Sequence, residues 1–427
     1  MKVLWLSLNS SLFYDNEQSG WTGALENALK TYYQDSINLA VAFENSYENR
    51  FKIVRHGTTY YPLNHSANKL NQFLYLTVIS GAGKWKLLKD ATLRAIHDFQ
   101  PDIIHCFGSE WPYGIIVKEV PIPVVIHMQG FLNIYLSIGN SVIGNSIIDN
   151  FKKLWQNNTI IDILSKIIYH KILSKPEISP ERFEREIMKA NHYFMGRTEW
   201  DKNIVKYFSP GSRYFHVPEA IRPIIYQARG QWKYHFNGKL QLLTITSGSV
   251  LKGAKVILQT AQILQDIVGL DFTWKVAGNQ KLFPIFEKQL GIRHDQVGVE
   301  LLGTINQEQI VEELTASDFF IHPSIIDNSP NAICEAQLIG IPVIASNVGG
   351  VPQLIDDKKT GFLFPYNEPH TLAFLIGNLF RQKELLTQIA QNEVLVSQAR
   401  HHPQHVADEV MRVYKTVLED FKIYDPK

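Results

Sequence analysis

Two acidic side chains, Asp327 and Glu335, lie eight positions apart on either side of a Ser-Pro step. Ser329 and Pro330 are of the types that favour the N-cap and the first residue of a helix, so they predict a helix start at this point. Glu335 would then lie about one and a half turns into the helix and face the same side as Asp327. The spacing therefore predicts two carboxylates at one site.

The start of this predicted helix offers hydrogen-bond donors as well. Its first amides have no acceptor within the helix and lie at the positive end of the helix dipole. They belong to Asn331, Ala332 and Ile333. Carboxylates that accept from hydroxyl groups, beside amides that bind phosphate, suit a polyhydroxylated ligand that carries phosphate. The spacing leaves open an alternative, in which the acids only complement the helix dipole.

Two further segments have residue types suited to phosphate. Lys252 ends the segment "TSGSVLK", which follows a predicted strand, and its charge could stabilise a leaving diphosphate. Gly20 and Gly23 lie between the first predicted strand and the first predicted helix, where glycine permits close approach of a ligand to the backbone. A solvated lysine and a plain loop are the alternatives.

Histidines stand at the ends of two predicted strands. His127 ends "PVVIH" and His105 lies near the end of "PDIIHCFG". Side chains at the carboxyl ends of parallel strands meet at the edge where α/β proteins bind ligands. We interpret His127 as a functional residue and His105 as a structural histidine. Glu110 follows on the same predicted rim, as a contact for an acceptor molecule.

The elements that position these residues alternate between strand and helix, in two halves, which indicates an α/β fold. The rhythm breaks over residues 217–239, a connector with Pro, Gly and aromatic residues. Short apolar runs predict strands at 2–8, 37–43, 102–108, 120–130, 239–249, 272–278, 299–304, 318–324, 341–347 and 360–366. Helical spacing predicts helices at 22–33, 252–267, 307–317, 329–340 and 402–421.

Composition excludes several classes of protein. The net charge of +1 over 427 residues offers no bulk attraction for nucleic acid. Two cysteines cannot form a disulfide framework, so we expect a cytoplasmic protein.

Residues 151–177 are apolar and rich in Lys. They could form a helix that touches the inner membrane face or a lipid-linked acceptor. The alternative, which we favour, is a packed helix with a solvated Lys face.

The segment 321–365 resembles the family-4 glycosyltransferases, a group of retaining enzymes with the GT-B architecture. The resemblance rests on the acid, seven residues, Glu-Ala pattern that ends at Glu335, and on "IGIPVIASNVGGVPQLIDDKKTGFLFP". It implies two facing Rossmann-like domains with a deep interdomain cleft. We expect an acceptor-binding domain at 1–225, a nucleotide-sugar-binding domain at 238–400, and a last helix, 402–421, that crosses back to the first domain.

The resemblance also implies roles for individual residues. Glu335 would hold the ribose of a nucleotide-diphosphate sugar, and Asp327 would hold hydroxyls of the transferred sugar. Lys252 would bind the diphosphate and His127 would lie close to the transferred sugar. The amides of the predicted helix start and the glycines of the first loop would contact the donor; these residues are Asn331, Ala332, Ile333, Gly20 and Gly23.

The chain departs from the family pattern at two places. Asp327 stands where the family commonly has Glu, and the family's Arg before Lys252-Gly253 is missing. Ser247 and Ser249 stand near the place of that Arg. Arg197 and Arg222 are candidates for the second cation, and Arg197 is also a candidate for acceptor binding.

We expect catalysis without a metal, because the sequence has neither an Asp-x-Asp triplet nor zinc-type spacing of His and Cys. The predicted function is transfer of a sugar, with retention, to a glycan or lipid-linked acceptor in surface polysaccharide or glycolipid synthesis. The alternatives are a GT-B sugar-nucleotide epimerase and a degenerate copy that binds sugar nucleotides as a scaffold.

Overall fold

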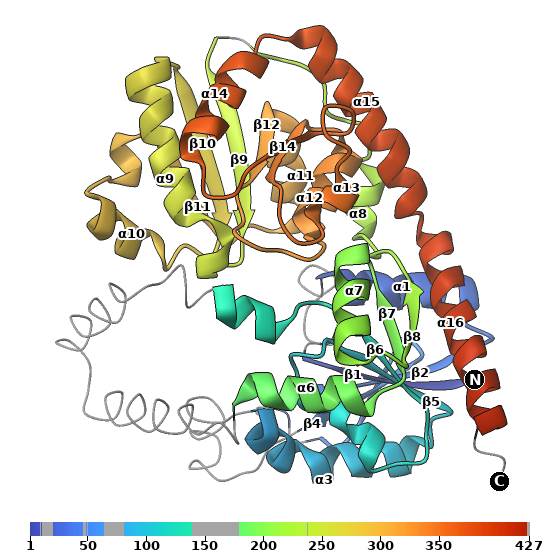
Figure 1. Ribbon diagram of the computed structural model, residues 1–427. Coiled ribbons are helices and arrows are strands. Elements are labelled where there is room, and N and C mark those ends of the chain that lie inside the picture. Colours follow the sequence, from blue (N-terminus) through green and yellow to red (C-terminus); the bar gives the residue numbers. More distant parts are fainter. Residues whose placement is uncertain are drawn as a thin grey trace. The chain divides into compact units, whose positions relative to one another are not determined.

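The computed structural model describes residues 1–8, 10, 20–45, 48, 50–63, 81–138, 179–236 and 238–424. The chain forms two compact units (Figure 1). Unit 1 contains residues 1–197, 201–218 and 406–427, and unit 2 contains 198–200 and 219–405. Each unit is thus assembled from segments that are not contiguous in the sequence.

Unit 1 is built on an eight-stranded sheet in the order β3-β4-β2-β1-β5-β6-β7-β8. All neighbours pair in parallel except β3 and β4, which are antiparallel. The central strands are buried on both faces, as their continuous apolar runs predict. The strands are β1 (Lys2–Ser7), β2 (Asn38–Glu44), β3 (Ile53–Arg55), β4 (Thr58–Leu63), β5 (Ile103–Phe107), β6 (Val124–His127), β7 (Tyr193–Gly196) and β8 (Arg213–His216).

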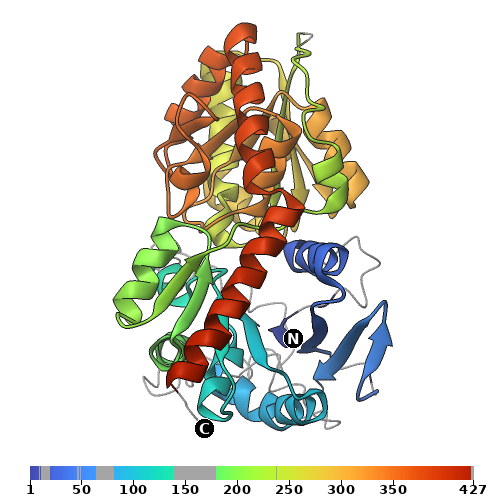
Figure 2. The same cartoon turned by 90° about the vertical axis from the view of Figure 1, so that its right-hand side faces the viewer.

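The last helix of the chain packs in unit 1, where Figure 2 shows it in red along the sheet. The Tyr414 hydroxyl accepts a hydrogen bond of 3.0 Å from Trp5 Nε1 and forms a second one with His105 Nδ1, at 2.6 Å. First strand and last helix are thus joined through a buried polar cluster. The helices are α1 (Gly20–Tyr33), α3 (Gly81–Phe99), η1 (Pro112–Lys118), α6 (Pro180–Ala190), α7 (Glu199–Phe208) and α16 (Pro403–Tyr424).

Unit 2 has a six-stranded sheet in the order β11-β10-β9-β12-β13-β14, with all pairs parallel. This is the doubly wound order 3-2-1-4-5-6, and its topological switch point lies between β9 and β12. Ligands of such sheets bind beyond the carboxyl ends of the strands at that point. The strands are β9 (Leu240–Thr246), β10 (Phe272–Gly278), β11 (Val299–Gly303), β12 (Phe319–His322), β13 (Val343–Ser346) and β14 (Phe362–Phe364).

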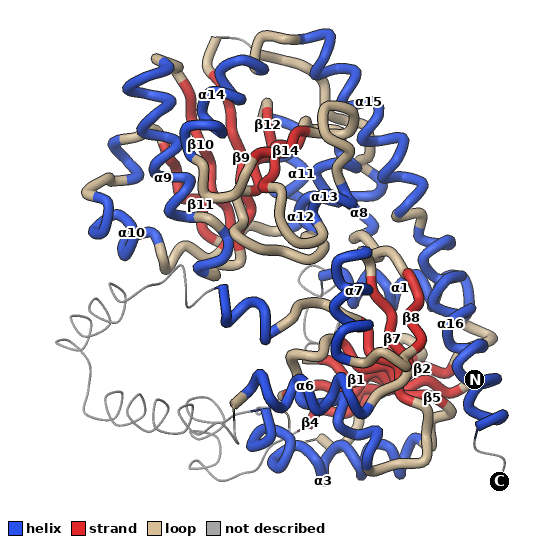
Figure 3. The backbone as a smooth tube through the Cα atoms, in the orientation of Figure 1, coloured by secondary structure: helices blue, strands red, loops and turns tan. Residues whose placement is uncertain are grey.

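The helices of unit 2 form two packed groups, α9 with α10 and α14, and α12 with α8, α11 and α15. Figure 3 shows these groups on opposite faces of the sheet. The helices are α8 (Pro223–Gln227), η4 (Val250–Lys252), α9 (Ala254–Ile263), the π-helix η5 (Leu264–Val268), α10 (Phe283–Leu290), η6 (His294–Gln296), α11 (Gln307–Ala316), α12 (Asn331–Ile339), α13 (Val351–Leu354), α14 (Pro369–Leu379) and α15 (Lys383–Arg400).

The predicted α/β fold is confirmed, and among the described residues a strand or helix is present at every position where the sequence predicts one. The segment 151–177 lies outside the described residues. Within the described part of the chain, no helix is long and apolar enough to span a bilayer.

One helix boundary was predicted wrongly. Helix α12 begins at Asn331, and Pro330 rather than Ser329 is its N-cap. The Ser329 hydroxyl donates to a carboxylate oxygen of Glu219. This tertiary hydrogen bond holds the Ser329 side chain beside Glu219, one residue ahead of the N-cap.

Candidate functional site

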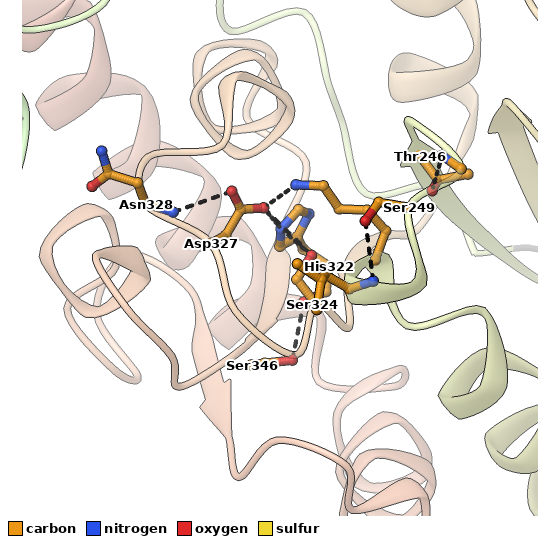
Figure 4. Close-up of polar contacts among 10 residues, drawn as sticks. Thr246, Ser249, His322, Ser324, Asp327, Asn328 and Ser346 are labelled. Atoms are coloured by element: carbon orange, nitrogen blue, oxygen red, sulfur yellow. Dashed lines mark hydrogen bonds and ion pairs between the residues drawn. The ribbon is translucent and has the colours of Figure 1, made fainter. Parts of the chain in front are cut away.

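At the switch point of unit 2, Lys252 forms an ion pair with Asp327, the residue labelled at the centre of the polar contacts in Figure 4. Lys252 follows β9, and Asp327 follows the neighbouring strand β12. His322 Nε2 donates to the same oxygen, Asp327 Oδ2, at 3.0 Å. The other oxygen, Oδ1, accepts from the amide of Asn328 at 3.2 Å. The sequence thus brings a cation and a carboxylate to the point where this type of sheet binds ligands.

The electrostatics keep Asp327 ionised. Burial alone would raise the pKa of its carboxyl group, but the charge of Lys252 and the hydrogen bond from His322 hold the pKa well below its usual range. Burial also lowers the pKa of His322, against the opposing effect of Asp327. The site therefore presents an anionic acceptor beside a lysine.

Glycines allow the loops of this site to pack against one another. Gly253 has φ +79°, and a Cβ atom there would lie 2.0 Å from the carbonyl oxygen of Pro323. Gly349 has φ +53°, and its Cβ would lie 2.0 Å from the carbonyl oxygen of Asp327. The Gly-Gly turn after β13 is therefore fitted against the loop that carries Asp327.

This packing predicts that Gly253→Ala is more destabilising than Gly269→Ala. Both glycines have a positive φ, which costs an alanine about 1–2 kcal/mol, but Gly269 has no atom within 4 Å of the new Cβ. The clash at Gly253 adds about 1–3 kcal/mol. Urea unfolding of both variants measures the difference, and equal losses would contradict the close packing of this loop.

Glu335 lies on α12 and is held by Arg222, which precedes α8. Arg222 Nε donates to Glu335 Oε1 at 2.8 Å, and Arg222 Nη2 donates to Glu335 Oε2 at 2.6 Å. Both side chains are largely buried, with exposed fractions of 14% for Arg222 and 8% for Glu335. Each acid of the acid-x7-acid pattern therefore has a basic partner within unit 2.

The start of α12 offers fewer donors than the sequence predicts. The Ile333 amide is not available, because it donates to the Pro330 carbonyl at 3.0 Å. The amides of Asn331 and Ala332 precede the first intrahelical hydrogen bonds. Asn331 Oδ1 is buried without a hydrogen-bond partner among the described residues. The donors expected from this helix start are thus those two amides.

The two serines that stand near the place of the missing Arg differ in their surroundings. Ser247 is exposed. Ser249 is the N-cap of η4, and its hydroxyl accepts from the Leu251 amide at 3.3 Å. Ser249 therefore stabilises the turn that ends in Lys252.

Unit 1 brings a second set of predicted residues together around His127. Its ring is fully buried, 4.8 Å from the Trp21 ring and 5.3 Å from the His105 ring, measured between centroids. Burial, with His105 and Arg197, holds the pKa of His127 well below its usual range. Both ring nitrogens have no hydrogen-bond partner among the described residues. A neutral imidazole so placed can bind a ligand hydroxyl.

Arg197 follows β7, and its guanidinium carbon lies 4.3 Å from the centre of the Trp21 ring. Gly20 and Gly23 lie in the first turn of α1, and Gly20 has φ +58°, which favours glycine.

His105 differs from His127, because its ring is hydrogen-bonded to Tyr414; burial lowers its pKa to about 3. This is consistent with a structural histidine.

Burial, and to a lesser degree the Glu184 carboxylate, raise the pKa of the Glu110 carboxyl group to about 8, although backbone hydrogen bonds oppose the shift. The Glu110 side chain folds back onto Gly108, where a Cβ atom would lie 2.5 Å from Glu110 Oε2. That oxygen is buried without a hydrogen-bond partner among the described residues. Near neutral pH, Glu110 is therefore largely protonated and can donate a hydrogen bond.

This pKa predicts how stability depends on pH. The unfolded chain releases the Glu110 proton near pH 4.5 and the folded chain near pH 8, so raising the pH between these values disfavours the folded state. We expect Glu110→Gln to match the parent at pH 5 and to be more stable than the parent at pH 8. Thermal unfolding across this range measures it, with the exposed Glu300→Gln as control. A difference that does not grow with pH would contradict the assignment.

Sequence reasoning did not find several residues of these sites. Trp21, His322 and Glu184 were not singled out, and the pairing of Arg222 with Glu335 was not anticipated. Glu184 accepts from Ser109 Oγ and from the Leu132 amide, both at 2.9 Å. His322 lies near the end of the predicted strand 318–324, so its position was a signal that could have been used.

A comparison with protein families finds that residues 231–394 match the family described as Glycosyl transferases group 1. The amylovoran biosynthesis glycosyltransferase AmsK of Erwinia amylovora is 27% identical over 146 residues, which are 33% of this chain and 36% of that protein. The alpha-D-kanosaminyltransferase of Streptomyces kanamyceticus is 25% identical over 149 residues, 35% of this chain and 39% of that protein. The chain therefore spans little more than a third of the length of these relatives.

Solved structures match over nearly the whole chain. Sucrose-phosphate synthase from Thermosynechococcus elongatus has a TM-score of 0.71 at 12% identity, covering 98% of this chain and all of that one. Anabaena HepE in complex with UDP and glucose has a TM-score of 0.60 at 15% identity, covering 97% of this chain and all of that one. At these identities the likeness shows the fold, which is that of the GT-B glycosyltransferases.

Proposed function

We propose that this chain, which carries a glycosyl transferases group 1 domain over residues 231–394, transfers a sugar from a nucleotide-diphosphate sugar to an acceptor hydroxyl with retention of anomeric configuration. Unit 2 would bind the donor and unit 1 the acceptor. The setting we propose is polysaccharide or glycolipid synthesis, which is supported by the similarity to AmsK, named for amylovoran biosynthesis.

The observation that carries this proposal is the Lys252–Asp327 pair at the switch point of unit 2. A lysine there can stabilise the charge that develops on a leaving diphosphate. Asp327 Oδ2 is occupied by Lys252 and His322, whereas Oδ1 has a single 3.2 Å hydrogen bond from the Asn328 amide. Hydroxyls of the transferred sugar would therefore approach Oδ1.

Glu335 would bind the hydroxyls of the donor ribose. Both of its oxygens accept from Arg222, so at least one of these hydrogen bonds must be replaced or shared when ribose binds. Arg222, one of the candidates for the second cation, is itself engaged in this ion pair. The amides of Asn331 and Ala332 would add neutral donors.

In unit 1, Glu110 and Arg197 would contact the acceptor, and His127 would lie close to the transferred sugar. A neutral imidazole and a protonated carboxyl group can hold and orient a hydroxyl without carrying charge into a buried site. In a front-face reaction, the bond between sugar and diphosphate breaks as the acceptor oxygen forms the new bond on the same face. The departing phosphate oxygen takes the acceptor proton.

Calorimetric titration with UDP-, GDP-, ADP- and dTDP-sugars, with and without EDTA, tests the donor assignment. We expect one nucleotide to bind selectively in both buffers. Incubation of that donor with candidate glycan acceptors, followed by NMR of the product anomer, tests turnover and retention. Binding without transfer or donor hydrolysis would favour the scaffold alternative. Absence of binding to every donor would overturn the proposal.

A further inference from the structure

Three side chains suited to binding a transition metal lie together inside unit 2. The Glu219 carboxylate, the Cys334 thiol and the His401 imidazole each offer one ligand atom, and these atoms lie within 4.8 Å of one another. Their exposed fractions are 1%, 0% and 0%. The three residues are far apart in the sequence, so no ligand-spacing motif reveals them. We call this group the Glu-Cys-His cluster.

Two of these side chains have hydrogen-bond partners of the kind that metal ligands commonly have. His401 Nδ1 donates to the backbone carbonyl of Glu219 at 2.9 Å and lies 4.0 Å from Glu219 Oε2. The Ser329 hydroxyl donates to Oε1 of Glu219. Histidines that bind a metal usually donate their second nitrogen to a carbonyl or carboxylate, and ligating carboxylates are usually hydrogen-bonded in turn.

From this geometry we propose that the Glu-Cys-His cluster binds one divalent cation of the zinc class. Sulfur, nitrogen and oxygen donors in one tetrahedral shell suit Zn²⁺. Bonds of about 2.0–2.3 Å place the ligands of such a shell roughly 3.5 Å apart, so the cluster contracts by about 1 Å as it binds the ion. The thiol loses its proton to solvent and binds as thiolate, and a water molecule completes the shell.

The position of the cluster indicates a structural role. Glu219 is the first residue of the long segment of unit 2, His401 lies between α15 and α16 near the end of that segment, and Cys334 lies on α12. A bound ion ties both ends of the segment to the helix that carries Glu335. The proposal does not depend on the proposed transfer reaction, because metal binding is measured without a substrate.

Cobalt(II) is the probe that tests this site. The full chain is stripped of metal, titrated with Co²⁺ and followed by absorption spectroscopy. We expect about one equivalent to bind with tetrahedral d–d bands and a thiolate-to-cobalt charge-transfer band, and Zn²⁺ to displace it. Cys334→Ser should lose the charge-transfer band. Cys106→Ser removes the other cysteine, which is equally buried but lies on β5 of unit 1, and should keep it.

Two more measurements guard against misfolded variants and against surface binding. In the parent chain, Zn²⁺ should slow the alkylation of Cys334 at least tenfold while leaving that of Cys106 unchanged, as measured by peptide mass spectrometry. His402→Gln and His405→Gln remove the neighbouring exposed histidines and should keep the charge-transfer band. Absence of this band in the parent, or equal alkylation with and without Zn²⁺, would overturn the proposal.

Discussion

Glu335→Gln is expected to weaken binding of the nucleotide sugar by about 10- to 150-fold. A hydrogen bond to a charged acceptor contributes about 1.5–3 kcal/mol, and the substitution removes the charge while keeping the volume of the side chain. The ribose hydroxyls would lose the ionised acceptor that the proposed donor site offers them. Calorimetric titration of parent and variant with the selected donor measures the change.

Arg222→Gln is the matched control, because it breaks the same ion pair from the other side. Both variants should lower the melting temperature, since each leaves a largely buried charge with a neutral partner. Arg222→Gln should retain donor affinity within several-fold, because it leaves the Glu335 carboxylate accessible to ribose. Equal loss of affinity in the two variants would show that the ion pair, rather than the Glu335 carboxylate, maintains the site.

Lys252→Met should reduce kcat by about 100- to 1000-fold, the usual effect of removing one group that stabilises developing negative charge. Donor affinity should fall much less, because the charge on the departing diphosphate is greatest in the transition state. Steady-state kinetics with the acceptor found by screening, together with the dissociation constant of the donor, separates the two effects.

Lys255→Met is the control for Lys252→Met. Lys255 lies in the first turn of α9, three residues further along, and is likewise partly exposed. The control should leave kcat unchanged. Lys252→Met also leaves Asp327 without its ion-pair partner, which lowers stability, so melting temperatures are measured for both variants. If Lys252→Met folds and keeps the parental kcat, Lys252 has no part in leaving-group stabilisation.

Much of the fold could be predicted because each element carries its own signal. Strands such as β5 and β12 are short apolar runs buried on both faces, and this pattern is present in the local sequence. Helix α12 was misplaced by one residue, because the partner of Ser329 is Glu219, 110 positions away. A local preference for capping cannot reveal a competing tertiary contact.

The candidate site could be predicted only in part, for the same reason. Asp327 and Glu335 stand in a local pattern, whereas the arginine that holds Glu335 lies 113 positions away in the connector. The ligands of the Glu-Cys-His cluster come from three separate segments. The charge state and burial of a side chain depend on residues that only the fold brings around it. The raised pKa of Glu110 and the unpartnered nitrogens of His127 therefore appear only in the folded unit.

The contact between Trp5 and Tyr414 has a consequence for biosynthesis. The sheet of unit 1 is translated before the long segment of unit 2, but the helix that contacts its buried Trp5 and His105 is translated after that segment. A ribosome must make all of unit 2 before the core of unit 1 can be completed. During that interval the nascent sheet exposes apolar surface, which is the condition that recruits chaperones. Unit 2, whose long segment is continuous from 219 to 405, can fold first.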